Sequence, residues 1–210
     1  GDVQDQPIRV DMTPVGNHEA GFVIRDSVRH RRTIERAYMS AILHAKTSIL
    51  LVCPYFLPGR RLRKVLYATA KRGVQITILL QGRADHPLLQ MATRALYTRL
   101  LGAGISVCEY EKSMLHGKVA VVDDAWATVG SSNLDPFSLF LNREANVVVL
   151  DAGFARNLRE SVMEEIKGGA LICRVEDWQK RSLLDRARSW FAYGLARWAA
   201  GVIGFAKYWA

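Results

Sequence analysis

The chain has 210 residues, with 29 Lys and Arg against 20 Asp and Glu, a formal net charge of +9 and 50% hydrophobic residues. This composition excludes a disordered or fibrous protein, because it supplies enough apolar side chains for a packed core. The excess of positive charge points to an anionic partner, which is a phosphate ester, a nucleic acid or an acidic membrane surface. Cys53, Cys108 and Cys173 fit neither a disulfide framework nor a zinc site, which favours a reducing compartment.

The predicted elements, in chain order, alternate between strands and helices after a polar, proline-containing segment over 1–15, which is typical of a linker from a preceding domain. Apolar runs and helical spacing predict strands over 22–24, 48–53, 74–80, 105–110, 118–123, 126–130 and 145–150, and helices over 32–46, 61–71, 87–101 and 154–166. This alternation predicts an α/β fold over residues 16–172, a three-layer α/β/α sandwich with a mixed β-sheet.

Residues 173–210 form a separate, basic and Trp-rich tail, for which we predict an amphipathic helix. Four of the five tryptophans lie at or after position 178, and residues 189–210 carry only two charges, Arg197 and Lys207. Trp, Tyr and basic side chains around apolar ones favour the lipid headgroup boundary. Because Arg197 interrupts the apolar run, we expect 178–210 to lie on a membrane surface rather than to span it. A helix that packs on the lobe or on another subunit is the alternative.

The most informative stretch runs from Leu115 to Glu144. His116 and Lys118 are two positions apart at the start of an apolar strand, so their side chains point to the same side. A two-residue turn at 124–125 places Lys118 opposite Ser131 and His116 opposite Asn133. We therefore predict that these four polar side chains share one face of a hairpin, and that a slip of one residue would scatter them.

These residue types suit the cleavage of a phosphodiester. The ammonium of Lys118 is worth on the order of 4 kcal/mol to a charge at ~4 Å in an intermediate dielectric. Asn133 and Ser131 can donate hydrogen bonds that strengthen as charge builds on the phosphoryl oxygens. The neutral imidazole of His116 is a nucleophile for phosphorus, and its protonated form is an acid for the leaving alkoxide. No metal and no cofactor are expected, because Lys118 and Asn133 take the role of a cation.

Two carboxylates complete the candidate catalytic set. Glu144, at the head of the next strand, is the candidate partner for the far ring nitrogen of His116, where it would fix the tautomer. Asp123 faces the other side of its strand and is expected to hold the scaffold through an ion pair or backbone contacts. The predicted catalytic set is His116, Lys118, Asp123, Ser131, Asn133 and Glu144.

The spacing of these residues resembles the signature (HKD) of the phospholipase D superfamily: His116-x-Lys118-x4-Asp123-x6-Gly130-Ser131-x-Asn133. In that family Glu144 holds the position of the acid that orients the histidine. The resemblance covers about residues 21–166, where segments 54–59, 71–82, 100–110 and 126–149 are similar to the second half of bacterial cardiolipin synthases. It implies a phosphohistidine intermediate, a two-step exchange, and a second lobe with the same signature that faces this one.

Only one signature is present in this chain. His44 and Lys46 have the same spacing, but Leu51 stands where the signature has Asp, so His44 is predicted to be a side chain at a helix end. Either the chain is the C-terminal half of a two-lobed enzyme, which the absent initiator Met favours, or one lobe dimerises. In the two-lobed family the nucleophile belongs mainly to the first lobe, which makes His116 the general acid and then the base. In a symmetric dimer either copy takes either role.

The resemblance implies a phosphatidyltransferase like cardiolipin synthase, with phosphatidylglycerol as donor and acceptor, on the cytoplasmic face of the bacterial inner membrane. Alternatives are a phospholipase D-type phosphodiesterase, a dimeric endonuclease favoured by the positive charge, and a silent lobe used for tethering. The Trp-rich tail favours lipid over nucleic acid as the partner. Substrate-binding candidates are Tyr55, Arg60 and Arg61; core packing is the alternative for Tyr55, and a solvated face for the two arginines.

Overall fold

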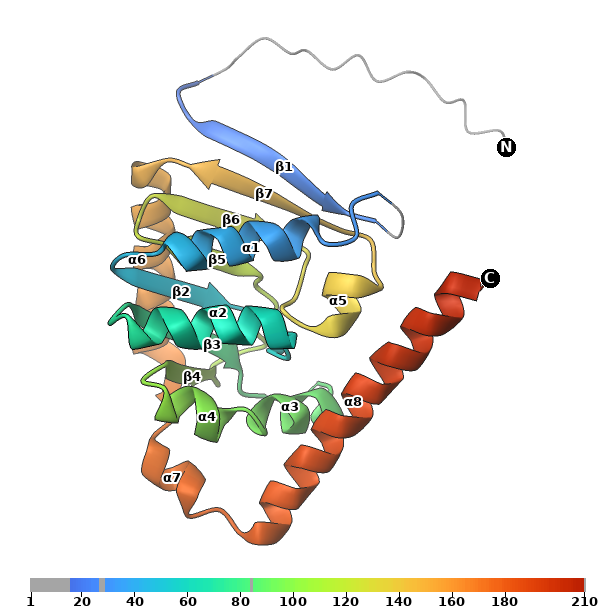
Figure 1. The fold of residues 1–210 in the computed structure, drawn as a ribbon. Coiled ribbons are helices and arrows are strands. Elements are labelled where there is room, and N and C mark those ends of the chain that lie inside the picture. Colours follow the sequence, from blue (N-terminus) through green and yellow to red (C-terminus); the bar gives the residue numbers. More distant parts are fainter. Residues whose placement is uncertain (1–15, 27–28, 84, 210) are drawn as a thin grey trace.

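The structure is a computed structural model that describes residues 16–26, 29–83 and 85–209, so the predicted linker over 1–15 lies outside the described residues. In this part of the chain, eight strands form one sheet in the order β1-β7-β6-β5-β2-β3-β4-β8 (Figure 1). The strands are β1 (Glu19–Arg25), β2 (Ser48–Val52), β3 (Gln75–Gln81), β4 (Ser106–Tyr110), β5 (Val119–Val122), β6 (Trp126–Gly130), β7 (Glu144–Leu150) and β8 (Ala170–Ile172).

The sheet is mixed, as predicted. Strands β2, β3 and β4 run parallel to one another, and every other pairing is antiparallel. The helices are α1 (Thr33–His44), α2 (Arg60–Lys71), α3 (Pro87–Arg94), α4 (Tyr97–Gly102), α5 (Pro136–Phe140), α6 (Ala152–Gly169), α7 (Val175–Gln179) and α8 (Leu183–Trp209).

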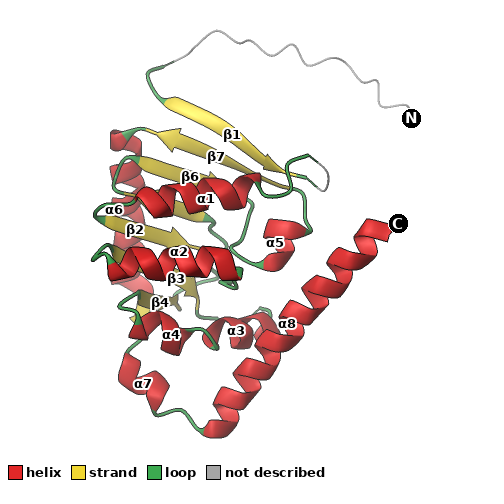
Figure 2. Ribbon diagram, viewed as in Figure 1, coloured by secondary structure: helices red, strands yellow, loops and turns green. Residues whose placement is uncertain are grey.

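Helices cover both faces of the sheet, which confirms the three-layer α/β/α prediction (Figure 2). Along β2, Ile49 and Leu51 pack into the larger core with α1 and α2, whereas Leu50 and Val52 pack into a second core with α6. Because successive side chains of a strand point to opposite faces, a continuously apolar run is what a strand covered on both sides requires.

The helix predicted over 87–101 is two helices, α3 and α4. The backbone N–H of Leu96 donates to the carbonyl of Thr93 and that of Arg99 donates to Leu96, each at 3.0 Å. These i−3 bonds tighten the chain between the two helices. The short elements α5, β8 and α7 were not predicted, because three to five residues are too few to show the hydrophobic periodicity of a helix or a strand.

The tail forms the long helix α8, which packs against α3 and α5 (Figure 1). Its inner face is made mostly of small residues and joins the larger core through Ala192, Tyr193 and Ala196. Its opposite face is apolar and exposed: Phe191 is 72% exposed and Trp198 65%. The helix therefore packs on the lobe, which is the alternative given above, and it also presents an exposed apolar face. Within the described residues no helix has the length and apolarity needed to cross a bilayer.

Candidate active site

The hairpin that carries the signature differs by one residue from the predicted register. Val122 pairs with Trp126 and Val119 with Val129, so Lys118 falls opposite Gly130 and not opposite Ser131. The backbone N–H of Gly130 donates to the Lys118 carbonyl at 3.1 Å. The loop holds three residues between the paired Val122 and Trp126, not two, because both Asp123 and Asp124 adopt left-handed backbone angles (φ 51° and 48°). The predicted pairing of four side chains across the hairpin is therefore wrong.

Asp123 lies at the far end of β5 from Lys118 and binds backbone. Its carboxylate accepts hydrogen bonds from the backbone N–H groups of Lys46, Thr47 and Ser48 at 2.7–2.9 Å, and from the Thr47 hydroxyl at 2.8 Å. Burial alone would raise the pKa of Asp123, but these hydrogen bonds outweigh it and lower the pKa. The carboxylate thus joins the β5–β6 turn to the start of β2.

His116 lies in the loop before β5, with an exposed side chain. The loop is held on both sides of the histidine: Gln81 Oε1 accepts from the Leu115 N–H at 2.6 Å, and Lys118 Nζ donates to the His116 carbonyl at 2.8 Å. The exposed side chain of His116 is accessible to a substrate or to a facing protein.

Lys118 is the buried cation of the site, with 7% of its surface exposed. Burial lowers the pKa of Lys118, and acidic neighbours that include Glu144 and Asp135 oppose that change. The neighbouring thiol of Cys53 is uncharged at neutral pH, because burial raises its pKa to about 12. A buried ammonium is well suited to receive a phosphate anion.

Asn133 lies next to a buried carboxylate. Its side chain hydrogen-bonds to Asp135, which also caps α5 by accepting from the N–H groups of Phe137 and Ser138 at 2.8 and 2.9 Å. Burial raises the pKa of Asp135, and these hydrogen bonds oppose the change. Asn133 Oδ1 is buried, and it has no hydrogen-bond partner in the described part of the chain.

Glu144 contacts Ser131 rather than the predicted His116. Ser131 Oγ donates to Glu144 Oε2 and accepts from the Ala145 N–H at 3.1 Å. Among residues 16–26, 29–83 and 85–209, no hydrogen bond joins Glu144 to the His116 ring. A cavity of about 760 Å³ opens beside Ser131 and Glu144 and is also lined by Arg25, Arg29 and Arg143.

Asn146 supports the site and was not identified from the sequence. It is 2% exposed, and its amide donates to Thr128 Oγ1 at 3.2 Å while its Oδ1 accepts from the Ser132 N–H at 3.4 Å. A Cβ on Gly130 would stand 2.4 Å from the Asn146 side chain. The glycine of the signature is thus required for this close approach. The available signal was a polar residue within the stretch of β7 that follows Glu144 and is otherwise apolar.

The three predicted substrate-binding residues separate into two groups. Tyr55 is 3% exposed and its hydroxyl accepts from the His86 N–H at 3.1 Å, a position that suits packing in the core. Arg60 and Arg61 are exposed at the start of α2 and line a cavity of about 300 Å³ with Arg32 and Arg197. The two arginines therefore face an anion-compatible space, whereas Tyr55 does not.

The chain matches relatives of one kind along most of its length. Residues 38–166 match the model of the cardiolipin synthase, phospholipase D-like domain. The chain is 38% identical over 190 residues to cardiolipin synthase B of Salmonella typhi, covering 90% of this chain and 46% of that protein. It is 32% identical over 164 residues to the minor cardiolipin synthase ClsB of Bacillus subtilis, covering 78% of this chain and 41% of that protein. The chain thus spans about half the length of these relatives.

Solved structures show the same fold. The phospholipase D family member Nuc from Salmonella typhimurium superposes with a TM-score of 0.63 at 22% identity, over 75% of this chain and 99% of Nuc. Phosphatidylserine synthase from Haemophilus influenzae superposes with a TM-score of 0.68 at 13% identity, over 88% of this chain and 47% of that protein. With the matched signature and the matched relatives, the chain belongs to the cardiolipin synthase, phospholipase D-like family.

Proposed function

We propose that this lobe is half of a phosphatidyltransferase of the cardiolipin synthase type, which moves a phosphatidyl group from one phosphatidylglycerol to another. The observation that carries the proposal is the buried Lys118 ammonium beside the exposed His116, at the end of the sheet where Asn133 and Glu144 also lie. These side chains supply one cation, one amide and one imidazole at the same end of the sheet. They offer charge stabilisation and proton transfer from the chain's own residues.

The reaction divides into two displacements at phosphorus. In the first, an imidazole nitrogen forms a bond to the donor's phosphorus, the bond from phosphorus to the headgroup glycerol oxygen breaks, and an acid protonates that oxygen. In the second, the headgroup hydroxyl of another phosphatidylglycerol gives its proton to a base and attacks phosphorus, and the N–P bond breaks. The products are one cardiolipin and one glycerol. Lys118 would stabilise the negative phosphoryl oxygens in both steps.

Two histidines are needed for this scheme, one as nucleophile and one as acid and base. His116 is exposed, within the described residues it is hydrogen-bonded only through its backbone carbonyl, and the chain spans about half of its matched relatives. Both facts support a second lobe that faces His116, either from the same protein or from another copy. Lys118 and Asn133 would supply one half of the phosphate clamp. We therefore expect no turnover from a single lobe alone.

The membrane is the proposed place of action. The outward face of α8 is apolar, and a helix of this kind lies in the interface between headgroups and acyl chains. We infer peripheral binding to an anionic membrane, at the cytoplasmic face of the bacterial inner membrane, with α8 parallel to its surface.

Product analysis on phosphatidylglycerol vesicles tests the function, with His116→Ala and His44→Ala as a matched pair. His44 has the same H-x-K spacing but sits at the end of α1 with its ring on the Ser40 carbonyl at 2.8 Å. Cardiolipin and glycerol from the full-length protein and from His44→Ala, with neither from His116→Ala, is the expected result. Equal activity of the two variants would contradict the role of His116.

An endonuclease is the second candidate, because Arg25, Arg29 and Arg143 line the cavity beside Ser131 and Glu144 and suit a nucleic-acid backbone. The same preparations are therefore incubated with linear DNA. Cleavage of DNA that depends on His116, without cardiolipin formation, would replace the phosphatidyltransferase proposal.

A further inference from the structure

A second basic cavity lies away from the signature, between α3, α4, α7 and the first turns of α8. It has a volume of about 240 Å³, and none of the residues that line it is acidic. Its lining includes four arginines and two tryptophans, which together we call the arginine–tryptophan pocket: Arg94, Arg99, Arg181, Arg186, Trp178 and Trp190. None of the predicted catalytic residues lines this pocket.

Aromatic rings hold two of the guanidinium groups in place. The guanidinium carbon of Arg181 lies 3.7 Å from the ring centroid of Trp178, and that of Arg99 lies 5.0 Å from the centroid of Trp190. Stacking on an indole fixes a guanidinium while its N–H groups remain free to donate. The pocket is thus partly organised for an anion before any ligand arrives.

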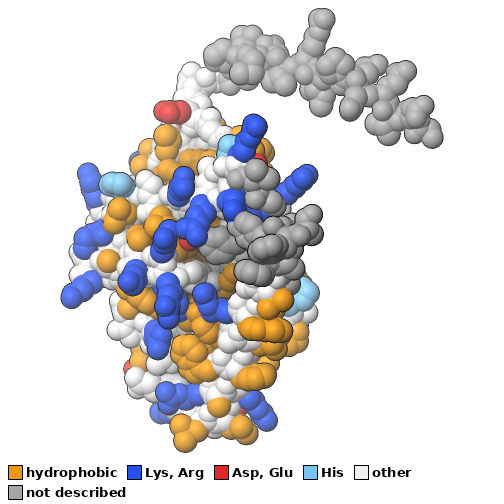
Figure 3. All heavy atoms as spheres, turned by 45° about the vertical axis from the view of Figure 1, so that its right-hand side comes forward, with side chains coloured by type: hydrophobic (Ala, Val, Ile, Leu, Met, Phe, Trp, Pro, Cys, Tyr) orange, Lys and Arg blue, Asp and Glu red, His pale blue; other side chains and the backbone are white. Residues whose placement is uncertain are grey.

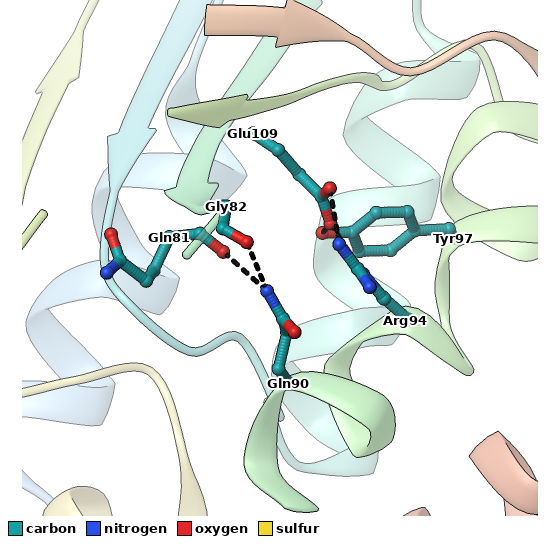
Figure 4. A network of polar contacts seen from close by, with 6 residues as sticks. All are labelled: Gln81, Gly82, Gln90, Arg94, Tyr97 and Glu109. Carbon is teal, nitrogen blue, oxygen red and sulfur yellow. Dashed lines mark hydrogen bonds and ion pairs between the residues drawn. The ribbon is translucent and has the colours of Figure 1, made fainter. Parts of the chain in front are cut away.

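The buried carboxylate of Glu109 is already paired with Arg94. Both oxygens of Glu109 accept from Arg94, at 2.8 and 2.7 Å, and one also accepts from the Tyr97 hydroxyl at 2.8 Å (Figure 4). Within the described residues, no ion pair involves Arg99, Arg181 or Arg186. Burial, and then the positive charge of Arg94, lower the pKa of Arg181. A bound anion would relieve this repulsion between like charges.

The pocket adjoins the outward face of α8, which fixes the kind of anion that can reach it. Trp190 lines the pocket and is 39% exposed, and the neighbouring Phe191 and Leu184 are 72% and 60% exposed. Figure 3 shows hydrophobic side chains gathered along α8, with Lys and Arg side chains on the elements beside it. Apolar side chains next to a cluster of cations match the chemistry of a bilayer edge, where acyl chains and phosphates meet.

We propose that the arginine–tryptophan pocket binds the headgroup phosphate of an anionic phospholipid in the bilayer, at a docking site separate from the reaction centre. The inference rests on the proposed function only in that it places the protein on a membrane. The docked lipid would hold α8 against the surface while a different lipid occupies the site at His116 and Lys118. Nucleic acid would use the arginines but leave the apolar face of α8 in water, so the lipid is favoured.

Binding to vesicles tests the pocket with two charge-matched double variants of the full-length protein. Arg99→Gln with Arg186→Gln removes two cations from the pocket and leaves the Arg94 ion pair in place. Arg156→Gln with Lys167→Gln removes two exposed cations from α6, on the other side of the sheet. Co-sedimentation is measured with phosphatidylglycerol in phosphatidylcholine, with a fatty acid replacing phosphatidylglycerol at equal charge, and with inorganic phosphate added as competitor. Thermal unfolding verifies that each variant is folded.

The pocket variant is expected to bind phosphatidylglycerol vesicles roughly 25-fold more weakly, at about fivefold for each arginine, and the α6 variant to change by less than about threefold. The loss should be smaller on fatty-acid vesicles, and free phosphate should compete only weakly. Equal losses in the two double variants, or equal losses on both kinds of vesicle, would overturn the proposal, as would full displacement by free phosphate. Turnover is read separately: wild-type protein that binds but makes no cardiolipin contradicts the proposed function and leaves the pocket intact.

Discussion

The side chain of Asn146 lies directly against the Cα of Gly130: a Cβ at Gly130 would stand 2.4 Å from both Cγ and Oδ1 of the asparagine. Asn146 in turn accepts from the Ser132 N–H, so the contact joins β7 to the loop that carries Asn133. A side chain at position 130 would have to displace a buried amide and the backbone carbonyl of Ala145, which lies 2.5 Å from the same Cβ position.

Gly130→Ala is therefore expected to lower the free energy of unfolding by about 1–3 kcal/mol through overpacking and to remove activity with it. Urea denaturation measures the first effect. Gly168→Ala is the matched control, since it lies in α6 with nothing within 4 Å of a Cβ. Alanine favours a helix over glycine by about 0.5–1 kcal/mol, so the control should be as stable as the wild type or more so. A stable and active Gly130→Ala protein would contradict the role assigned to this contact.

Asp123→Asn tests the carboxylate that joins the β5–β6 turn to β2. Asparagine tolerates the left-handed backbone at this position. The substitution therefore removes the negative charge and one acceptor oxygen without straining the backbone. We expect a loss of about 2 kcal/mol at pH 7, because several backbone donors lose a charged acceptor.

The pH dependence of that loss follows from the lowered pKa of Asp123. A carboxylate whose pKa is lower in the folded state contributes stability above its unfolded pKa, and this stability is lost as the pH falls through the folded pKa. The difference between wild type and Asp123→Asn should therefore shrink as the pH falls below about 4. Glu160→Gln, on an exposed position of α6, is the control. A difference that stays constant down to pH 2 would refute the assignment.

Arg94→Ala separates a structural arginine from the proposed ligand-binding ones. The substitution leaves Glu109, which is 3% exposed, as a buried charge whose one remaining side-chain partner in the described part of the chain is the Tyr97 hydroxyl. Loss of one partner from a buried pair costs about 3–5 kcal/mol. Chemical denaturation should show this loss for Arg94→Ala and a change below about 1 kcal/mol for Arg186→Gln, as usual for an exposed position. The same stability for both variants would mean that the ion pair has no structural role.

The outward face of α8 is expected to act in binding and not in folding. Phe191→Ser with Trp198→Ser should leave the thermal midpoint within about 2 °C of the wild type and weaken vesicle binding, since both side chains are mostly exposed. Ala196→Ser, on the buried face, is the comparison and should affect stability instead. Unaltered vesicle binding of the first variant would contradict membrane contact through α8.

The general fold was predictable because burial on both faces leaves a clear mark in the sequence. The runs over 48–53 and 74–80 are almost continuously apolar, and both form central strands of the sheet. The position of the β5–β6 turn was not predictable to one residue. The turn depends on two adjacent aspartates that both adopt positive φ. The hydrogen bonds from the backbone of Lys46 and Ser48 to the Asp123 carboxylate, which hold the turn in this position, come from a distant part of the chain.

The spacing of the signature predicts which residues lie near one another, but it does not predict their contacts. The spacing identified Lys118, Asn133 and Glu144, and the structure places them at one end of the sheet. Two contacts depend on the path of the loop after β6: the hydrogen bond between Glu144 and Ser131, and the contact of Asn133 with Asp135. This loop has no regular hydrophobic pattern from which its path could be predicted. The exposure of His116 could not be predicted from the spacing, because the histidine lies in the loop before β5.

The most direct test of the account follows both halves of the exchange in one reaction. Full-length protein is incubated with phosphatidylglycerol labelled in its headgroup glycerol, and cardiolipin and free glycerol are measured over time. We predict one glycerol released for each cardiolipin formed, with both products absent in His116→Ala and present in His44→Ala. Release of glycerol with phosphatidic acid and no cardiolipin, or any product formation that persists without the His116 imidazole, would contradict it.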